Sequence, residues 1–203
     1  ISVSQRKAAA DKVKIAYVGI GNRGEQIIGD FARTGMVEVV ALCDVDMGAP
    51  HTQKVMNMYP KAKRFRDFRQ MFDKAGNDFD AVAIATPDHS HFPITMLALA
   101  SGKHVYVEKP LARTFYEAEL LMQAALKRPN LVTQVGNQGH SEANYFQFKA
   151  WMDAGIIKDV TAVTAHMNNP RRWHGWDSGI YKLPSGQQLP NDMDWDTWLG
   201  VVP

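Results

Sequence analysis

The sequence predicts an α/β fold built on a doubly wound parallel sheet. Apolar segments of strand length alternate with helix-like stretches between residues 13 and 135. A glycine-rich turn joins the first of these segments to the helix after it, and polar or glycine-rich segments follow the later ones. Such alternation is typical of a parallel sheet that helices cover on both faces.

The first strand, turn and helix carry the most specific motif in the chain. The apolar run Val13–Val18 leads into Gly19-Ile20-Gly21-Asn22-Arg23-Gly24, and a second apolar run, Val37–Cys43, is closed by Asp44. Asp44 stands 20 residues after Gly24, which is the spacing of a dinucleotide-binding βαβ unit. These residues predict a Rossmann domain.

The residues of this turn suit a pyrophosphate. Gly19 permits a tight turn, Gly21 lets the backbone approach the phosphates, and Gly24 lets the helix pack closely on the strand. Asn22 and Arg23 complete the predicted cofactor-binding loop, where free N–H groups at the helix start attract negative charge. The alternative is a glycine turn in an α/β sheet that binds no nucleotide.

Asp44 predicts which dinucleotide binds. Its carboxylate would accept hydrogen bonds from the adenosine ribose hydroxyls and repel a 2′-phosphate. No arginine follows it in Asp44-Val45-Asp46-Met47. We therefore expect NAD, with NADP less favoured.

The remaining elements are predicted from periodicity and from end signals. Asp67 with Gln70, and Thr114 with Glu117, form capping-box patterns that open helices. Further helices are expected near residues 50–58, up to residue 100 and up to residue 127, and further strands within 61–66, 80–85, 104–107 and 131–135. Ligands bind outside the carboxyl ends of the strands in such a sheet, so residues 19–24, 44, 86–91, 108–110 and 136–140 should converge there.

The segment Glu108-Lys109-Pro110, together with the glycine loop, Ala85-Thr86-Pro87 and His91, resembles the Gfo/Idh/MocA family of oxidoreductases. The resemblance spans about residues 13–137 and implies an N-terminal Rossmann domain. It also implies that an α+β substrate domain on a large, open, mostly antiparallel sheet follows, of which this sequence would hold only the truncated start. It implies hydride transfer between a nicotinamide cofactor and a secondary alcohol of a sugar, cyclitol or related polyol. It also implies a homo-oligomer in the full-length protein.

The same resemblance implies roles at the end of the fifth main strand. Glu108 would contact the nicotinamide-side ribose, Lys109 would touch the reacting hydroxyl, and Pro110 would hold the backbone, often in a cis peptide. Oxidising a carbinol releases an O–H proton that the cofactor does not take, so a lysine here suits proton transfer. The alternative for Lys109 is a structural ion pair with a nearby carboxylate.

Other cofactor and substrate contacts are implied on neighbouring loops. Thr86, Pro87 and His91 would line the cofactor groove, and Asn137 would approach the nicotinamide or the substrate. His140 follows a strand-end glycine and could face the substrate cleft, so it is the second catalytic candidate.

The domain organisation is predicted in three segments. These are a lead-in over residues 1–12, an NAD(P)-binding Rossmann domain over 13–138, and an incomplete start of a C-terminal substrate and oligomerisation domain over 139–203. The last should open with a helix over 141–154 and a strand over 160–167. The glycine-rich segment with an Asp and a His that the family supplies next is not in this sequence. We expect an N-terminal piece of a longer protein, which need not be active alone; the alternative is a minimal cofactor-binding domain.

The segment from residue 168 to residue 203 is rich in aromatic and arginine side chains, namely Arg171, Arg172, Trp173, His174, Trp176, Trp195 and Trp198. Such residues suit a carbohydrate-facing loop. The alternative is a long loop pinned by its tryptophans or covered by a partner subunit. Residues 194–200 predict one short helical turn closed by glycine.

Composition narrows the function classes. The 203 residues carry a net charge of +2 with basic and acidic side chains interspersed, which gives no reason to expect nucleic acid. No apolar run reaches membrane-spanning length, and the single Cys43 excludes an internal disulfide. His89 and His91 lack further ligands nearby, so no metal is predicted. The compartment stays open between the cytoplasm and a bacterial periplasm.

Two other functions fit the same residues. Some relatives hydrolyse glycosides with tightly held NAD, which oxidises the sugar transiently. A nucleotide-binding module without turnover would keep the glycine loop, although an intact Glu108-Lys109-Pro110 argues against it.

Overall fold

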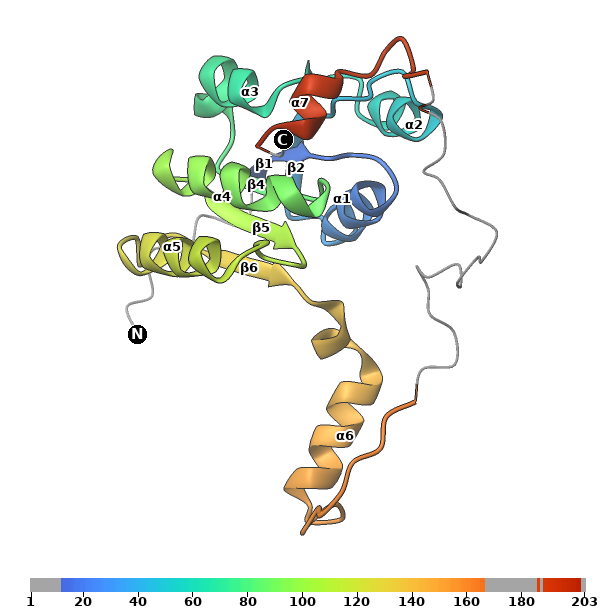
Figure 1. Ribbon diagram of the computed structural model, residues 1–203, viewed down its shortest axis with the longest axis vertical. Helices are drawn as coiled ribbons and strands as arrows, with labels where there is room; N and C mark the ends of the chain where they lie inside the picture. Colours follow the sequence, from blue (N-terminus) through green and yellow to red (C-terminus); the bar gives the residue numbers. More distant parts are fainter. Residues whose placement is uncertain (1–11, 167–185, 187, 202–203) are drawn as a thin grey trace. The chain divides into compact units, whose positions relative to one another are not determined.

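The computed structural model describes residues 12–166, 186 and 188–201 (Figure 1). Two compact units are distinguished by their internal contacts. One holds the chain up to Asn137 and takes it up again at Leu189, and the other runs from Gln138 to Gln188. The expectations for residues 1–11, Arg171 to His174 and Trp176 lie outside the described residues.

The first unit is a six-stranded parallel sheet (Figure 1). Its order is β3-β2-β1-β4-β5-β6, so the strand order reverses between β1 and β4. Each strand pairs in parallel with its neighbours. The strands are β1 Val13–Val18, β2 Val37–Cys43, β3 Lys63–Phe65, β4 Ala81–Ile84, β5 His104–Glu108 and β6 Thr133–Gly136. The predicted doubly wound sheet is confirmed, and its ligand site is expected at the reversal.

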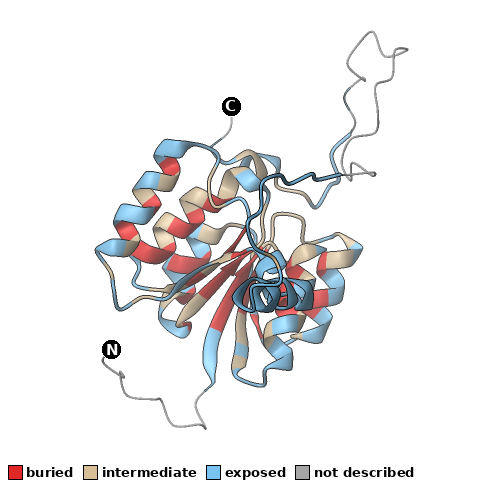
Figure 2. Ribbon diagram, turned by 90° about the horizontal axis from the view of Figure 1, so that it is seen from below, coloured by how far each residue is buried: buried red, intermediate tan, exposed pale blue. Residues whose placement is uncertain are grey.

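Helices cover both faces of this sheet. They are α1 Arg23–Arg33, α2 Pro50–Met58, α3 Phe68–Ala75, α4 His91–Ala100 and α5 Phe115–Leu126. On one face Tyr17 and Leu42 pack against Ile27 and Ile28 of α1 and residues of α2. On the other face lie side chains of α3, α4 and α5. Figure 2 shows the buried residues, in red, along the strands and on the helix faces toward them.

The predicted N-caps form at both helix starts. The Asp67 carboxylate accepts a hydrogen bond of 2.8 Å from the Arg69 N–H at the start of α3, and Thr114 Oγ1 accepts one of 3.1 Å from the Glu117 N–H in α5. Such caps satisfy N–H groups that the helix itself leaves without partners. The Glu117 carboxylate differs from a standard capping box, because it accepts from the N–H of Arg113 at 2.9 Å.

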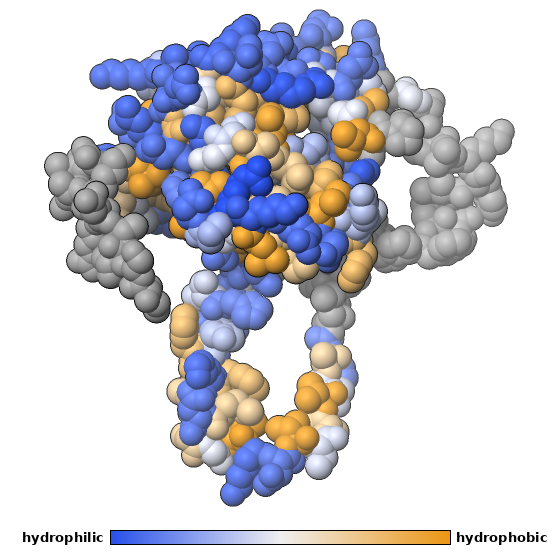
Figure 3. Space-filling view, turned by 90° about the vertical axis from the view of Figure 1, so that its left-hand side faces the viewer, coloured by the Kyte–Doolittle hydropathy of each residue, from blue (hydrophilic) through white to orange (hydrophobic). Residues whose placement is uncertain are grey.

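The second unit contains a 3₁₀ turn at Gln138–Ser141 and helix α6, Ala143–Asp153. No residue of α6 is buried within the described part of the chain, and its large apolar side chains Tyr145, Phe146, Phe148, Trp151 and Met152 are exposed. Figure 3 shows apolar side chains, in orange, on the face of the molecule in view.

The strand predicted at residues 160–167 was wrong for the residues that the structure describes. Residues 160–166 form no strand, and Val160 and Val163 are 55% and 85% exposed. The apolar spacing was real, but a strand also needs a neighbour for its backbone hydrogen bonds, and none pairs with it in the described residues. Met167 lies outside them.

The chain returns to the first unit as residues 189–201, which we call the strap. The strap contains helix α7, Trp195–Leu199, which Asp194 caps through the Thr197 N–H at 3.0 Å. Gly200 follows with a φ of 58°, so the single glycine-closed turn predicted here is confirmed. In the described residues, no helix combines the length and apolar character needed to cross a bilayer.

Candidate functional site

The glycine loop after β1 is packed too tightly for larger side chains. Gly19 has a φ of 78°, and a Cβ on it would lie 2.6 Å from the carbonyl carbon of Ala85 at the end of β4. A Cβ on Gly24 would collide with the Gly19 carbonyl oxygen. The start of α1 is thereby held against β1 and β4 at the carboxyl edge of the sheet, where a helix N-terminus attracts negative charge. The Gly24 N–H itself donates to the Gly21 carbonyl oxygen at 2.8 Å.

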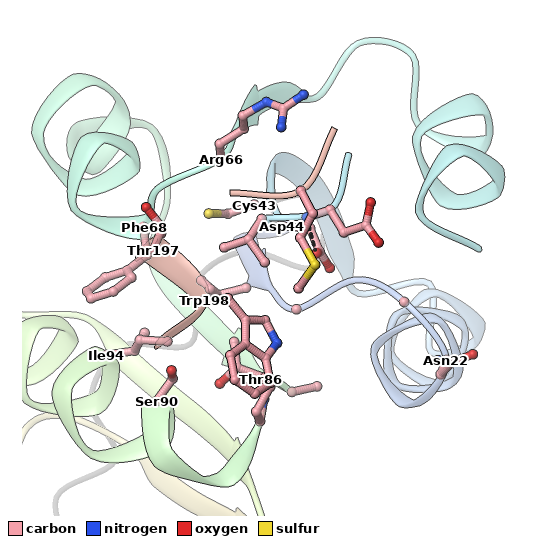
Figure 4. A pocket seen from close by; sticks show the side chains of 18 of the residues that line it. Asn22, Cys43, Asp44, Arg66, Phe68, Thr86, Ser90, Ile94, Thr197 and Trp198 are labelled. Carbon is pink, nitrogen blue, oxygen red and sulfur yellow. Dashed lines mark hydrogen bonds between the residues drawn. The ribbon is translucent and has the colours of Figure 1, made fainter. Parts of the chain in front are cut away.

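A cavity of about 280 Å³ lies at this edge, between the loops after β1, β2 and β4 (Figure 4). The predicted site residues that line it are Gly19, Gly21, Asn22, Asp44, Thr86 and Pro87. The structure thus brings together the glycine loop, the acid at the end of β2 and the loop after β4. This is where the sheet order reverses, as the fold predicts for a ligand site.

Asp44 is oriented by its neighbours. The Ile20 N–H donates to its Oδ2 at 2.9 Å and the Asp46 N–H donates to its Oδ1 at 3.0 Å. Burial raises the pKa of Asp44, although these backbone donors and the nearby His51 oppose the rise. Each carboxylate oxygen keeps a lone pair that can accept from a ribose hydroxyl.

Thr86 offers a polar group with no partner in the described part of the chain. Its Oγ1 is buried and unbonded there, and the residue lines the cavity. A buried hydroxyl without a partner costs free energy, so a ligand with polar atoms would satisfy it. The donor set of α1, the Asp44 carboxylate and this hydroxyl fits a dinucleotide.

Glu108 lies at the end of β5 and is only 5% exposed. Arg23 Nη2 and the Tyr106 hydroxyl both donate to its Oε1 at 3.0 Å. Burial first, and this hydrogen bond second, raise the pKa of Tyr106 to about 12. Arg23 of the glycine loop is therefore joined by an ion pair to Glu108, which precedes Lys109.

Lys109 is exposed at the same strand end, and its bond to Pro110 is cis, as the resemblance implied. It forms no ion pair with the other described residues, where the sequence had left a structural ion pair as the alternative. Its ammonium group is free of such a partner in this part of the chain.

His91 does not line the cavity. Its buried ring bridges two loops, because Nδ1 lies 2.6 Å from the Pro110 carbonyl oxygen and Nε2 lies 2.9 Å from that of Thr86. Both partners are acceptors, and which of them receives the ring N–H depends on the tautomer. His91 therefore connects the two site loops, and a direct contact with a cofactor stays a prediction.

Asn137 is exposed just after β6, where its N–H donates to the Val135 carbonyl at 3.0 Å. His140 belongs to the second unit, where its ring lies 5.2 Å from that of Tyr145. Their predicted roles stay predictions. Across residues 12–166, 186 and 188–201, no three His, Cys, Asp or Glu side chains gather as metal ligands.

Several cavity residues were not predicted as cofactor contacts, namely His51, Arg66, Phe68, Ser90, Ile94, Met193, Thr197 and Trp198. Of these, Ser90 lies in the segment 86–91 that was expected at this edge, and Trp198 lies in the segment interpreted as a carbohydrate-facing loop. Arg66 and Phe68 follow β3, and the sheet order alone could have placed them beside Asp44. Arg66 qualifies the argument for NAD, because an arginine does reach this cavity; its guanidinium donates to the Asp192 carbonyl of the strap. Nothing local in the sequence indicated that residues 193–198 return here.

Comparison with known proteins identifies the family of this chain. Residues 13–137 match the model of a family described as "Oxidoreductase family, NAD-binding Rossmann fold", Gfo/Idh/MocA. The chain belongs to this family. The predicted family, fold class and NAD-binding character are thereby confirmed.

Individual members of Gfo/Idh/MocA match at modest identity. Inositol 2-dehydrogenase of Salmonella typhimurium is 28% identical over 191 residues, covering 92% of this chain and 54% of that protein. A glycosyl hydrolase family 109 protein of Streptomyces niveus is 30% identical over 179 residues, covering 85% of this chain and 36% of that protein. The chain spans about half the length of the inositol dehydrogenases that it matches.

The fold also matches a solved member of the family. The scyllo-inositol dehydrogenase of Lactobacillus casei, solved with bound NAD(H) and scyllo-inositol, superposes with a TM-score of 0.66 at 29% identity. The match covers 74% of this chain and 44% of that one.

Proposed function

We propose that this chain binds NAD in preference to NADP and forms the cofactor half of an enzyme that moves a hydride to or from a secondary alcohol of a sugar, cyclitol or related polyol. The observation that carries the proposal is the cavity where Asp44, the glycine loop and Thr86 meet. Glu108 is the last residue of β5, which is the second strand from β1 in the sheet, and Lys109 follows it.

The residues that would hold the cofactor divide by chemistry. The N–H groups at the start of α1 face where a pyrophosphate binds, Asp44 accepts from the adenosine ribose, and Thr86 Oγ1 gains a partner. Bound NAD supplies the acceptor or donor for the hydride. Inositol dehydrogenases among the relatives support a polyol as the substrate class.

Lys109 would handle the proton. When a carbinol is oxidised, its C–H electron pair leaves as hydride and its O–H proton passes to a base. An exposed lysine without an ion-pair partner in the described residues can hydrogen-bond to that hydroxyl and take the proton in its neutral form. Arg23 and Tyr106 would act indirectly, because their hydrogen bonds hold Glu108, which is the residue before Lys109.

A second candidate is supported by the glycosyl hydrolase family 109 relatives. In that reaction the sugar is oxidised transiently, which acidifies a neighbouring C–H and eases elimination of the leaving group. Water then adds to the unsaturated ketone in place of the leaving group. The hydride returns to the carbonyl carbon, so the sugar is released and NADH does not accumulate. The cofactor residues named above would serve either reaction.

The test separates these functions by their products. The complete enzyme, of which this chain is proposed to be the cofactor half, is incubated with NAD⁺ and a panel of inositols and sugars, and separately with NAD⁺ and aryl glycosides. The proposal predicts NADH absorbance that grows with polyol and is lost in Lys109→Met. Aryl alcohol released without NADH would favour the hydrolase, and bound NAD⁺ with neither product would favour a binding module.

A further inference from the structure

We propose that the strap completes the adenosine half of the cofactor site, with Trp198 as the aromatic face against which the adenine ring packs. This inference rests on the NAD binding proposed above. It adds a binding surface from residues 189–201, which follow the second unit in sequence yet belong to the first unit in contacts.

The strap is anchored beside Asp44 by its backbone. Met193 forms an antiparallel bridge with Asp46, and the Asp194 N–H donates to the Val45 carbonyl at 3.1 Å. The Asp192 side chain fills the space where Gly48 has no Cβ, since a Cβ there would lie 2.5 Å from Oδ2. These contacts do not involve the tryptophan side chains, so the strap should keep its place when one is removed.

A second anchor joins α7 to the loop after β4. His89 Nε2 lies 2.6 Å from the Trp198 carbonyl oxygen, and the two rings are 4.9 Å apart at 63°. The strap therefore connects the loop that follows β2 with the loop that follows β4. Figure 1 shows α7, in red, over this edge of the sheet.

Trp198 lies where the adenine base of a bound dinucleotide is expected. Figure 4 shows its indole at the same cavity as Asp44, Phe68 and Thr86. If Asp44 binds the adenosine ribose, the adenine, which is bonded directly to that ribose, must lie next to Asp44 in the same cavity. Trp198 and Phe68 supply the aromatic walls that a flat, weakly polar ring needs there.

Trp195 defines which face of Trp198 is available. The two indoles stack with centroids 4.8 Å apart and planes only 4° from parallel. One face of Trp198 is thus covered, which leaves its other face or its edge for a ligand. Trp195 is 38% exposed and does not line the cavity, so it is the matched control on the same helix.

The test is a calorimetric titration of the 203-residue chain with NAD⁺, AMP and nicotinamide mononucleotide. Trp198→Ala should weaken NAD⁺ and AMP binding about tenfold, in line with the loss of one stacked base, and leave the mononucleotide unaffected. Trp195→Ala should stay within about threefold of the wild type, because its contact with the base is indirect.

Two further variants separate stacking from simple filling of space. Trp198→Phe keeps an aromatic face and should retain most of the affinity, whereas Trp198→Leu keeps apolar volume only and should lose it. Far-UV circular dichroism checks that each variant folds. Trp198→Leu binding as well as Trp198→Phe, or Trp195→Ala losing as much affinity as Trp198→Ala, would overturn the inference.

The failure of this inference differs from the failure of the proposed function. A wild-type chain that binds NAD⁺ while Trp198→Ala binds it equally well leaves the cofactor proposal standing and removes the strap from the site. A wild-type chain that binds no NAD⁺ contradicts the cofactor proposal itself.

Discussion

Among single residues, Asp44 is the one to which we assign the choice of cofactor, and hydrogen bonds within the protein orient its carboxylate. Two backbone N–H groups, from Ile20 and Asp46, fix both of its oxygens. Burial nevertheless works against its charge and raises its pKa. A carboxylate that must stay ionised to accept two ribose hydroxyls is therefore the group through which pH should act on binding.

We expect NAD⁺ affinity to fall in acid, beginning at a pH above the usual range for an aspartate. A raised pKa means that Asp44 takes up its proton earlier as pH falls, and the protonated form loses an acceptor for the ribose. Titrations with NAD⁺ at a series of pH values measure this directly. Asp44→Asn, which has no charge to lose, should show a weaker and flatter profile; identical profiles in the two proteins would contradict the role of Asp44.

At the scale of elements, the loops of the site are tied to one another by side chains. His91 at the start of α4 bridges the carbonyl groups of Thr86 and Pro110, and Arg23 at the start of α1 binds Glu108 at the end of β5. The cofactor loop and the loop with Lys109 are thereby held in fixed register by contacts between different elements.

In the ion pair between Arg23 of α1 and Glu108 of β5, replacing Arg23 should lower the free energy of unfolding more than replacing Glu108. Arg23→Gln leaves the Glu108 carboxylate, whose side chain is 6% exposed, without its cation and should lower the free energy of unfolding by about 2 kcal/mol or more. Glu108→Gln keeps an acceptor for Tyr106 and leaves Arg23, which is partly exposed, free to reach water, so its loss should be smaller. Urea denaturation of both variants and of the double variant measures the coupling; equal and additive losses would contradict it.

The elements also mark how far sequence could predict this protein. The strands and helices up to residue 136 were predicted because each has local signals, such as the caps at Asp67 and Thr114 and the glycine loop. The strand expected at 160–167 failed because apolar spacing does not supply a partner strand. The bridging role of His91 was missed because both of its partners are backbone carbonyls, which no motif names.

At the scale of the whole molecule, the site combines segments that are distant in sequence. Asp44 and Trp198 line one cavity although 153 residues lie between them, and nothing local in either segment indicates the other. The sequence did predict a short helical turn at residues 194–200, but the position of that turn beside this cavity came only from the structure.

The central claim is that this chain is an NAD-binding half-site that uses Asp44 to select its dinucleotide. Calorimetric titration of the wild-type chain and Asp44→Ala with NAD⁺ and NADP⁺ tests it most directly. We expect the wild type to bind NAD⁺ more tightly than NADP⁺. Asp44→Ala should lose about tenfold or more in NAD⁺ affinity, as expected when a charged hydrogen-bond acceptor is removed. Equal binding of both dinucleotides, or NAD⁺ binding that Asp44→Ala leaves unchanged, would contradict it.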